Sequence, residues 1–238
     1  MISILIKNIL NFFDYFHKRK ITKKLKTLNK KKALYTVFDV GGHRGETVEL
    51  FLKNFEIENL YSFEPSQENF KILSKKVDQL KKKFVKVNIF IENFALGKFD
   101  KDLELNYLNE TSSSTIRELN VDSSYFKKKE KFFEKLINKK ILIKQLKFKD
   151  YLIKKEISDI DLLKIDTEGF ELNVIKGLEK NYGIVKFIYF EHHYDDMIKK
   201  NYKFSNINKL LNNFGFKKVF KSKMYFRKSF EYIFENTI

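Results

Sequence analysis

The stretch LYTVFDVGGHRG, residues 34–45, decides the fold. It predicts a short buried strand over 34–38, a glycine loop over 39–45, and a helix that runs from Thr47 to Asn54. Glycines permit a tight turn and a close approach of ligand to backbone, and free N–H groups at the start of a helix favour an anionic group. The glycines stand at 41, 42 and 45, which differs from the dinucleotide fingerprint G-x-G-x-x-G.

The alternation of strands and helices continues through the rest of the chain. It predicts an α/β fold with a parallel sheet and right-handed crossovers. A loop rich in Ser, Thr and Asn is expected over 109–124. Strands are expected at 59–63, 85–91, 101–108, 141–148, 160–165, 185–190, 216–221 and 223–234, and helices at 66–82, 125–138, 172–178 and 203–213.

The amino-terminal segment differs in character from the rest of the chain. Apolar residues at helical spacing predict a helix over 2–20, and a run of Lys and Arg comes after it. We therefore divide the chain into a basic amphipathic helix with its connector, 1–32, and one domain, 33–238. A cap packed on the domain is the favoured role of the helix, and weak peripheral contact with an anionic membrane is the alternative. A signal peptide is disfavoured, because the charge comes after the apolar stretch.

The composition excludes several classes of function. The 238 residues contain no Cys, which removes disulfides, thiolate metal sites and cysteine nucleophiles and fits a cytoplasmic protein. No apolar run is long enough to span a membrane. The net charge is +17, but only four of the 48 basic residues are Arg, the residue that reads bases and phosphates with a bidentate fork. No specific nucleic-acid partner is therefore expected.

Polar residues follow the predicted strands where ligands bind in a doubly wound sheet. Asp39 is the first residue of the glycine loop and suits a ligand with an ammonium group. Glu64, followed by Pro65, is placed to accept from two ribose hydroxyls. Asn93 and the turn through Ala95 could frame an adenine.

Carboxylates and imidazoles also follow two later strands. Asp166 and Glu168 flank a tight turn beside the same cleft, although capping of the next helix is an alternative role for Glu168. Glu191, His192 and His193 follow the strand after that, and a His is the default general base. Neighbouring residues on a strand point to opposite faces, so we expect at most one of the two His to act. No metal site is predicted.

Four segments together resemble the FkbM family of S-adenosylmethionine-dependent methyltransferases: 38–45, 63–70, 94–96 and above all DLLKIDTEGFELNVIKG, 161–177. The family pattern in the last segment is K-x-D-x-E-G-x-E. The glycine loop departs from the usual D-V-G-A-N-x-G at Gly42 and His43. The resemblance covers roughly 34–220. It implies a Rossmann-like seven-stranded methyltransferase fold, a mostly parallel sheet with an antiparallel last strand.

The resemblance also implies a function. Members of the family are similar to O-methyltransferases that act on hydroxyls of sugars, polysaccharides or polyketides, so we expect S-adenosylmethionine as cofactor and a glycan or small-molecule acceptor. The expected base is His192 or His193, assisted or replaced by Glu191 or Asp166, and the loop 109–115 is a candidate acceptor lid. Alternatives are an RNA methyltransferase, a nicotinamide oxidoreductase and a non-catalytic binding domain. The expected cofactor residues are Asp39, Gly41, Gly42, His43, Gly45, Thr47, Glu64, Pro65, Asn93, Ala95, Asp166 and Glu168.

Overall fold

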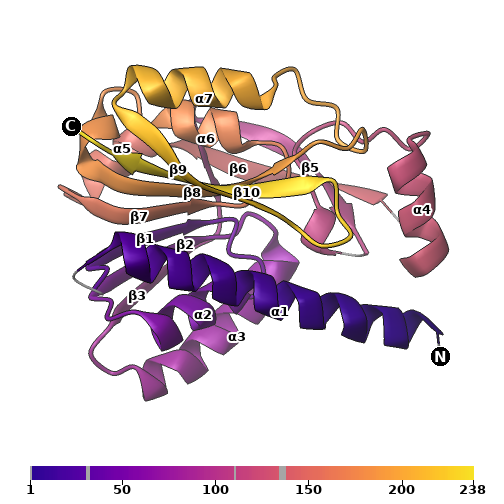
Figure 1. The fold of residues 1–238 in the computed structure, drawn as a ribbon, viewed down its shortest axis with the longest axis horizontal. Helices are drawn as coiled ribbons and strands as arrows, with labels where there is room; N and C mark the ends of the chain where they lie inside the picture. Colours follow the sequence, from indigo (N-terminus) through magenta and orange to yellow (C-terminus); the bar gives the residue numbers. More distant parts are fainter. Residues whose placement is uncertain (1, 31–32, 110, 134–137) are drawn as a thin grey trace.

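The computed structural model describes residues 2–30, 33–109, 111–133 and 138–238 (Figure 1). Side chains of 2–12, 111, 132–133 and 138 are outside this description. Three predicted features fall at least partly outside the described residues. They are the boundary at residue 32, Glu110 of the candidate lid, and the end of the helix predicted over 125–138.

A seven-stranded sheet forms the centre of the molecule, in the order β3-β2-β1-β7-β8-β10-β9. Strand β10 is antiparallel to both of its neighbours, and the pairs from β3 to β8 are all parallel. The predicted α/β sheet with an antiparallel last strand is confirmed. The strands are β1 Thr36–Val40, β2 Asn59–Phe63, β3 Asn88–Glu92, β7 Ile160–Ile165, β8 Val185–His193, β9 Phe216–Lys223 and β10 Ser229–Asn236.

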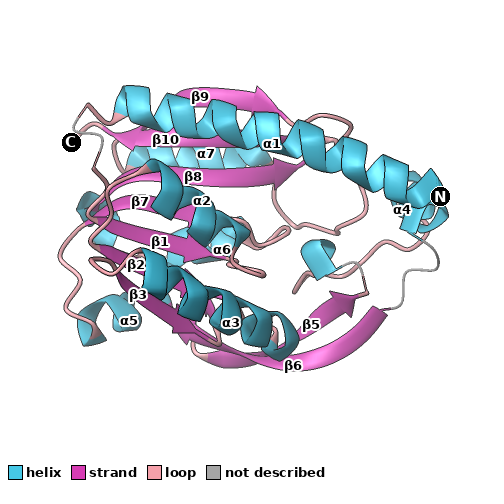
Figure 2. Ribbon diagram, turned by 90° about the horizontal axis from the view of Figure 1, so that it is seen from below, coloured by secondary structure: helices cyan, strands magenta, loops and turns pink. Residues whose placement is uncertain are grey.

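Helices cover both faces of this sheet (Figure 2). One face holds α1 Ile2–Leu28, α2 Glu46–Asn54 and α3 Gln67–Lys83, and the other holds α5 Phe148–Lys154, α6 Glu171–Gly177 and α7 Phe204–Asn213. Strand β1 is buried along its whole length because it lies between the two helical layers. Its side chains alternate between the layers: Val37 packs with α2 and α3, and Phe38 packs with α5.

A smaller sheet in the order β4-β6-β5 flanks the main one. It consists of β4 Ala95–Gly97, β5 Lys101–Leu108 and β6 Asn138–Lys147. The sequence predicts a turn in place of β4, but these three residues pair with β6, where Ala95 lies opposite Gln145. Helix α5 is not among the predicted elements, because the apolar pattern places Phe148 in the preceding strand. The remaining elements are η1 Thr111–Ser113, α4 Ser124–Phe133 and η2 Asn181–Ile184.

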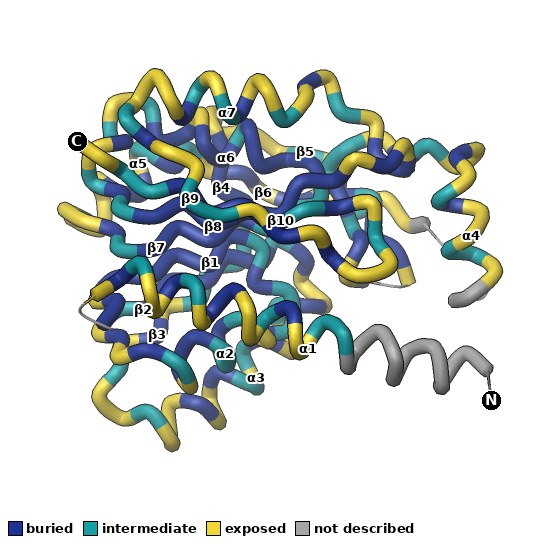
Figure 3. Tube along the Cα trace, viewed as in Figure 1, coloured by how far each residue is buried: buried dark blue, intermediate teal, exposed yellow. Residues whose placement is uncertain are grey.

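Helix α1 is longer than predicted and packs against the domain along its second half. Ile21 and Leu25 are buried in the core on the α2–α3 side. Figure 3 shows buried residues alternating with exposed ones along this half of α1. Arg227 donates to Asp14 at 2.8 Å, and His17 pairs with Glu231 of β10. This arrangement matches the expected cap. No helix in the described part of the chain has the length and apolarity needed to cross a membrane.

Candidate functional site

A cavity of about 630 Å³ lies at the carboxyl ends of β1, β2, β7 and β8. This is the edge of a doubly wound sheet where ligands bind. Its wall combines the glycine loop with residues of α1, the loop 109–116, the turn after β7, and the β9–β10 hairpin.

The glycine loop is shaped by close contacts with the neighbouring strands. Gly41 has φ +88°, and a Cβ built there would lie 1.9 Å from the carbonyl oxygen of Asp166. At Gly42 a Cβ would lie 2.2 Å from Ser62 Oγ, which explains why glycine replaces the usual alanine of the family pattern. Gly45 has φ +83° and forms the N-cap of α2. Only glycine suits the two positive-φ positions without strain.

Asp39 and Lys164 form a buried ion pair, here called the lysine–aspartate pair. The Lys164 Nζ lies 2.8 Å from Asp39 Oδ1 and donates to the Gly41 carbonyl at 2.9 Å. Burial raises the pKa of Asp39 against the effect of Lys164. Burial alone would lower the pKa of Lys164, but the charges of Asp39 and Asp166 outweigh it and raise that pKa to about 12. Asp39 does not line the cavity. Its contacts brace the glycine loop from behind.

Glu64 lies on the cavity wall and holds two loops together. Its carboxylate accepts from the backbone N–H of His43 and of Ser66, each at 2.9 Å. Burial raises the pKa of Glu64 to about 7, against the effect of these hydrogen bonds. Asn93 does not reach the cavity: its side chain donates to the backbone carbonyls of Glu64 and Pro65. It therefore supports the Glu64 segment from outside.

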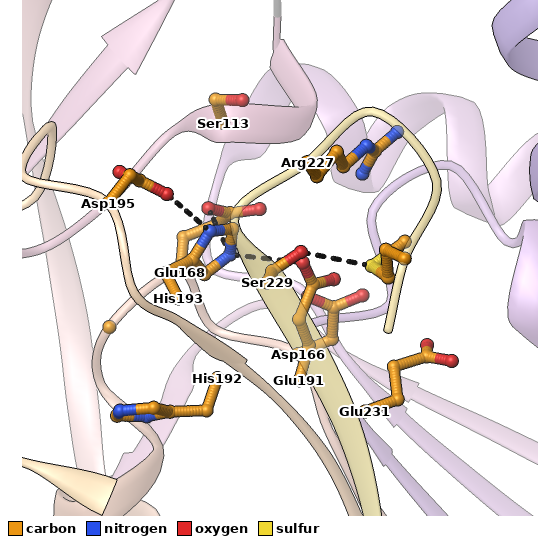
Figure 4. Close-up of polar contacts among 12 residues, drawn as sticks. Ser113, Asp166, Glu168, Glu191, His192, His193, Asp195, Arg227, Ser229 and Glu231 are labelled. Atoms are coloured by element: carbon orange, nitrogen blue, oxygen red, sulfur yellow. Dashed lines mark hydrogen bonds and ion pairs between the residues drawn. The ribbon is translucent and has the colours of Figure 1, made fainter. Parts of the chain in front are cut away.

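The turn after β7 and the end of β8 meet in a second charged group, here called the carboxylate–imidazole cluster (Figure 4). His193 Nε2 lies 3.1 Å from Glu168 and 3.3 Å from Glu191, and its Nδ1 lies 3.3 Å from Asp195. Both ring nitrogens thus face carboxylates. Burial lowers the pKa of His193, but the neighbouring carboxylates outweigh it and hold that pKa well above its usual value. The cluster therefore favours the cationic form of His193.

Two members of this cluster, Glu191 and Glu168, line the cavity. In Glu191 the electrostatics favour proton exchange. Burial raises its pKa to about 7, the nearby charges of Asp166 and Glu168 act in the same direction, and His193 opposes them. A carboxylate with this pKa exchanges a proton readily at neutral pH. Asp166 also lines the cavity, and Lys164 lies 3.7 Å from its carboxylate.

His192 points away from the cavity, as strand alternation predicts. Its Nδ1 lies 3.9 Å from Glu171 on α6, and its ring packs edge-on against Tyr194. Burial lowers its pKa. The two His therefore have different surroundings: His192 packs against α6, and His193 belongs to the carboxylate–imidazole cluster.

Most of the residues expected at the site lie on the cavity wall, and a few lie behind it. Those on the wall are Gly41, Gly42, His43, Thr47, Glu64, Pro65, Ala95, Asp166, Glu168 and Glu191. Those outside it are Asp39, Gly45, Asn93, His192 and His193.

Several wall residues were not anticipated. Asp14, His17, Lys18 and Ile21 of α1 line the cavity, although helical periodicity indicated only an apolar face. Arg227 of the hairpin and Glu231 of β10 also line it, and the sequence carries no motif that marks them. Lys164 stands in the K-x-D-x-E-G-x-E pattern and could have been found from it.

The loop named as a candidate acceptor lid contributes to the cavity wall. Asn109, Ser112, Ser114 and Ile116 line the cavity. Just beyond them, Arg117 Nε donates to the Gly169 carbonyl at 3.0 Å, which ties this loop to the turn that carries Glu168.

Some buried polar atoms of the wall have no hydrogen-bond partner within the described residues. They include Arg44 Nε, Asn69 Oδ1, Thr167 Oγ1 and, on α1, His17 Nδ1. Buried polar atoms are normally satisfied, so a polar ligand in the cavity would account for them. Across the ranges that the structure describes, no three His, Asp or Glu side chains are arranged to hold a metal ion.

Comparisons with known proteins point to methyltransferases. The model of the methyltransferase FkbM domain matches residues 39–218. The solved FkbM methyltransferase of Methylobacillus flagellatus KT aligns with TM-score 0.55 and 13% identity, over 85% of this chain and 44% of that one. This chain thus spans less than half of that protein's length. No curated protein matches the chain significantly.

Two further solved structures share the fold. Magnesium protoporphyrin IX methyltransferase of Synechocystis PCC 6803, with bound S-adenosyl-homocysteine, has TM-score 0.54 and 9% identity over 98% of this chain and 87% of that one. TrmK of M. capricolum, in complex with S-adenosyl-homocysteine, has TM-score 0.50 and 11% identity over 90% of this chain and 68% of that one. At these identities the likeness concerns the fold.

Proposed function

Since the chain belongs to the FkbM family of methyltransferases, we propose that it is an S-adenosylmethionine-dependent O-methyltransferase. Its acceptor would be a hydroxyl of a sugar, a polysaccharide or a related small molecule. One observation carries the proposal: a single cavity joins the glycine loop and Glu64 to the carboxylates Glu168 and Glu191. A cofactor site and a proton-accepting site therefore share one space.

The residues of the first half of the cavity fit the cofactor. When bound, S-adenosylmethionine would supply the methyl group of its sulfonium. Transfer of that methyl group to an oxygen of the acceptor leaves S-adenosyl-homocysteine. Glu64 would accept from the ribose hydroxyls. Thr167 and Asn69 offer buried oxygens that the described protein atoms leave unsatisfied. The excess of carboxylates on the wall favours a cationic ligand.

Glu191 is the base that this geometry supports best. His193 faces carboxylates with both ring nitrogens, so neither nitrogen is available to remove a proton from an acceptor. Its charge would instead orient Glu191 and Glu168. Glu191 lines the cavity and has a pKa near 7, so it could take the hydroxyl proton as the new bond forms. This assigns to Glu191 the role first expected of the His, and to His193 that of a positioning residue.

Calorimetry tests the cofactor assignment. S-adenosyl-homocysteine should bind at micromolar strength, and NAD far more weakly. Tighter binding of NAD would contradict the proposal and favour the oxidoreductase alternative.

A screen tests the reaction. The protein is incubated with S-adenosylmethionine and oligosaccharides, sugar phosphates or RNA, and release of S-adenosyl-homocysteine is measured. Turnover on a hydroxylated glycan supports the proposal, and turnover on RNA alone would replace its acceptor. Cofactor binding without turnover on any of them would favour a binding domain.

A further inference from the structure

The positive charge of the molecule is concentrated in two segments far apart in sequence. Residues 15–34 contain nine Lys and Arg, residues 216–230 contain six, and neither segment contains Asp or Glu. The first forms the second half of α1 and its connector, and the second forms β9 and the turn after it. These segments supply nearly all of the net charge of +17.

The fold brings the two segments side by side. The Phe13 ring lies 5.1 Å from that of Tyr225 and 5.0 Å from that of Phe226, measured between centroids. Lys20 Nζ lies 5.8 Å from the Phe220 ring. Both Figure 1 and Figure 2 show α1 running along β9 and β10. The two segments thus form one continuous surface.

Exposed aromatic side chains lie within this positive surface. Tyr15 and Phe16 of α1 are about half exposed, as is Tyr225, and Phe226 at the hairpin is 69% exposed. Phe226 also has φ +60°, a conformation that is strained for a bulky residue. We name this surface the basic–aromatic face, and it comprises Tyr15, Phe16, Lys20, Lys223, Tyr225 and Phe226.

We propose that the basic–aromatic face docks the protein on an anionic lipid bilayer. Lysines attract anionic headgroups, and aromatic rings are favoured at the boundary between headgroups and acyl chains. The positive charge of the face is complementary to such a surface, and neither of its two segments, 15–34 and 216–230, contains a carboxylate. The same helix begins with an apolar segment, in which seven of the residues 2–12 are Ile, Leu or Phe. Figure 1 shows this end of α1 continuing past the hairpin.

Nucleic acid is the other polyanion that such a face could bind. The apolar start of α1 favours the bilayer, because a segment rich in Ile, Leu and Phe suits a lipid interface better than a phosphate backbone. The predominance of Lys over Arg points the same way, since bidentate recognition of phosphate relies on Arg. We therefore commit to the lipid surface.

Docking by this face has a consequence for the acceptor, which rests on the proposed function. Asp14, His17 and Lys18 of α1 and Met224 and Arg227 of the hairpin line the cavity. The residues that border the face thus also border the site. A protein docked in this way would present its cavity at the membrane surface, where the acceptor would be a hydroxyl carried by a lipid.

Vesicle flotation tests the docking. The full chain is mixed with phosphatidylcholine vesicles, with or without about one third phosphatidylglycerol. We expect cosedimentation or flotation with the anionic vesicles only, and a decrease when salt is raised from ~50 to ~200 mM. Equal binding to both vesicles, or to neither, overturns the proposal.

Two double variants test the face itself. Tyr225→Ser with Phe226→Ser should weaken binding to anionic vesicles about tenfold or more, because it removes two inserted rings. Lys20→Glu with Lys223→Glu should do the same by reversing charge. The matched control is Lys98→Glu with Phe99→Ser, in the β4–β5 turn, where Phe99 is 55% exposed. It should bind vesicles like the unmodified protein, and equal losses in all three variants would contradict the assignment.

Each variant is also tested by calorimetry with S-adenosyl-homocysteine and by competition with tRNA. Retained cofactor binding shows that the fold is intact. If the face variants lose tRNA binding but keep vesicle binding, the occupant is nucleic acid and the proposal fails. Vesicle binding without cofactor binding in the unmodified protein would leave the docking in place and remove the proposed function.

Discussion

The lysine–aspartate pair and the carboxylate–imidazole cluster are both buried, yet they differ in charge balance and access. Lys164 lies 2.8 Å from the fully buried Asp39, which is not on the cavity wall, and 3.7 Å from Asp166, which is. His193 meets three carboxylates, and two of them line the cavity. An ion pair whose carboxylate lies behind the cavity wall can stabilise a loop. An unbalanced cluster open to a cavity keeps a carboxylate with a pKa near 7 and is suited to proton transfer.

The largest effect is expected from removing the cation of the lysine–aspartate pair. Lys164→Met leaves Asp39 buried without its partner, which should lower the free energy of unfolding by about 3–5 kcal/mol. Urea denaturation measures this loss. Adding Asp39→Asn should restore much of it, since the stranded charge is then gone. A Lys164→Met protein as stable as the unmodified one would show that the pair contributes no net stability.

The corresponding change in the open cluster should affect rate and leave stability nearly unchanged. Glu191→Gln removes the proposed base, so kcat for the acceptor found in the screen should fall about 10²- to 10⁴-fold. Affinity for S-adenosyl-homocysteine should change little. The control is Glu118→Gln, an exposed carboxylate whose ion pair is with Lys199. An unchanged kcat in Glu191→Gln would remove Glu191 from the mechanism.

A smaller effect is expected on the wall at the cofactor end. Glu64→Ala removes an acceptor of hydrogen bonds from the ribose, and such bonds to a charged group contribute about 1.5–3 kcal/mol. S-adenosyl-homocysteine should therefore bind roughly 10- to 150-fold more weakly, as measured by calorimetry. Glu58→Ala, at an exposed position just before β2, is the control. Equal affinity in both variants would contradict the ribose assignment.

The smallest effect concerns pH. Burial raises the pKa of Glu64 to about 7, so the group is mostly protonated at pH 6 and mostly ionised at pH 8. The ionised form accepts from hydroxyls and attracts a cation, so cofactor affinity should rise with pH by about tenfold across this interval. Calorimetry at both pH values measures the rise. Glu64→Gln should flatten it, and a slope that persists in this variant would point to another group.

The pH dependence of folding has the opposite sign at this residue. Because the folded-state pKa of Glu64 lies above its usual value, ionisation is disfavoured in the folded protein. The free energy of unfolding should therefore fall as pH rises from the usual carboxyl pKa toward 7, and then level off.

The regular half of the fold was predictable because its signals are local. The predicted bounds of β2 and of β7 are the observed ones, since each strand is a short apolar run with a polar residue at its end. The family pattern around Asp166 and Glu168 located the turn after β7 from sequence alone. Strand β8 is longer than predicted, because Glu191 and the two His, although polar, continue to pair with β10.

The other side of the cavity could not be predicted, because its contacts join distant parts of the chain. Nothing in the periodicity of α1 indicates that Asp14 meets Arg227 or that His17 meets Glu231. The pairing of β4 with β6 likewise depends on a partner far along the chain. The protonation state of His193 depends on Asp195 and Glu168, whose distances from it are set by tertiary structure.

The contacts of α1 with the hairpin also bear on how the protein is made. A ribosome releases residue 14 long before residue 227, so the ion pair between Asp14 and Arg227 cannot form while the chain is still short. Until β10 has emerged and paired, Ile21 and Leu25 lack part of the surface that buries them. Helix α1 is therefore fully packed only after β10, more than 200 residues later in the chain, has been made. We expect the cavity to be completed late, after synthesis of the sheet, and nascent chains that end before residue 224 to remain open at this side.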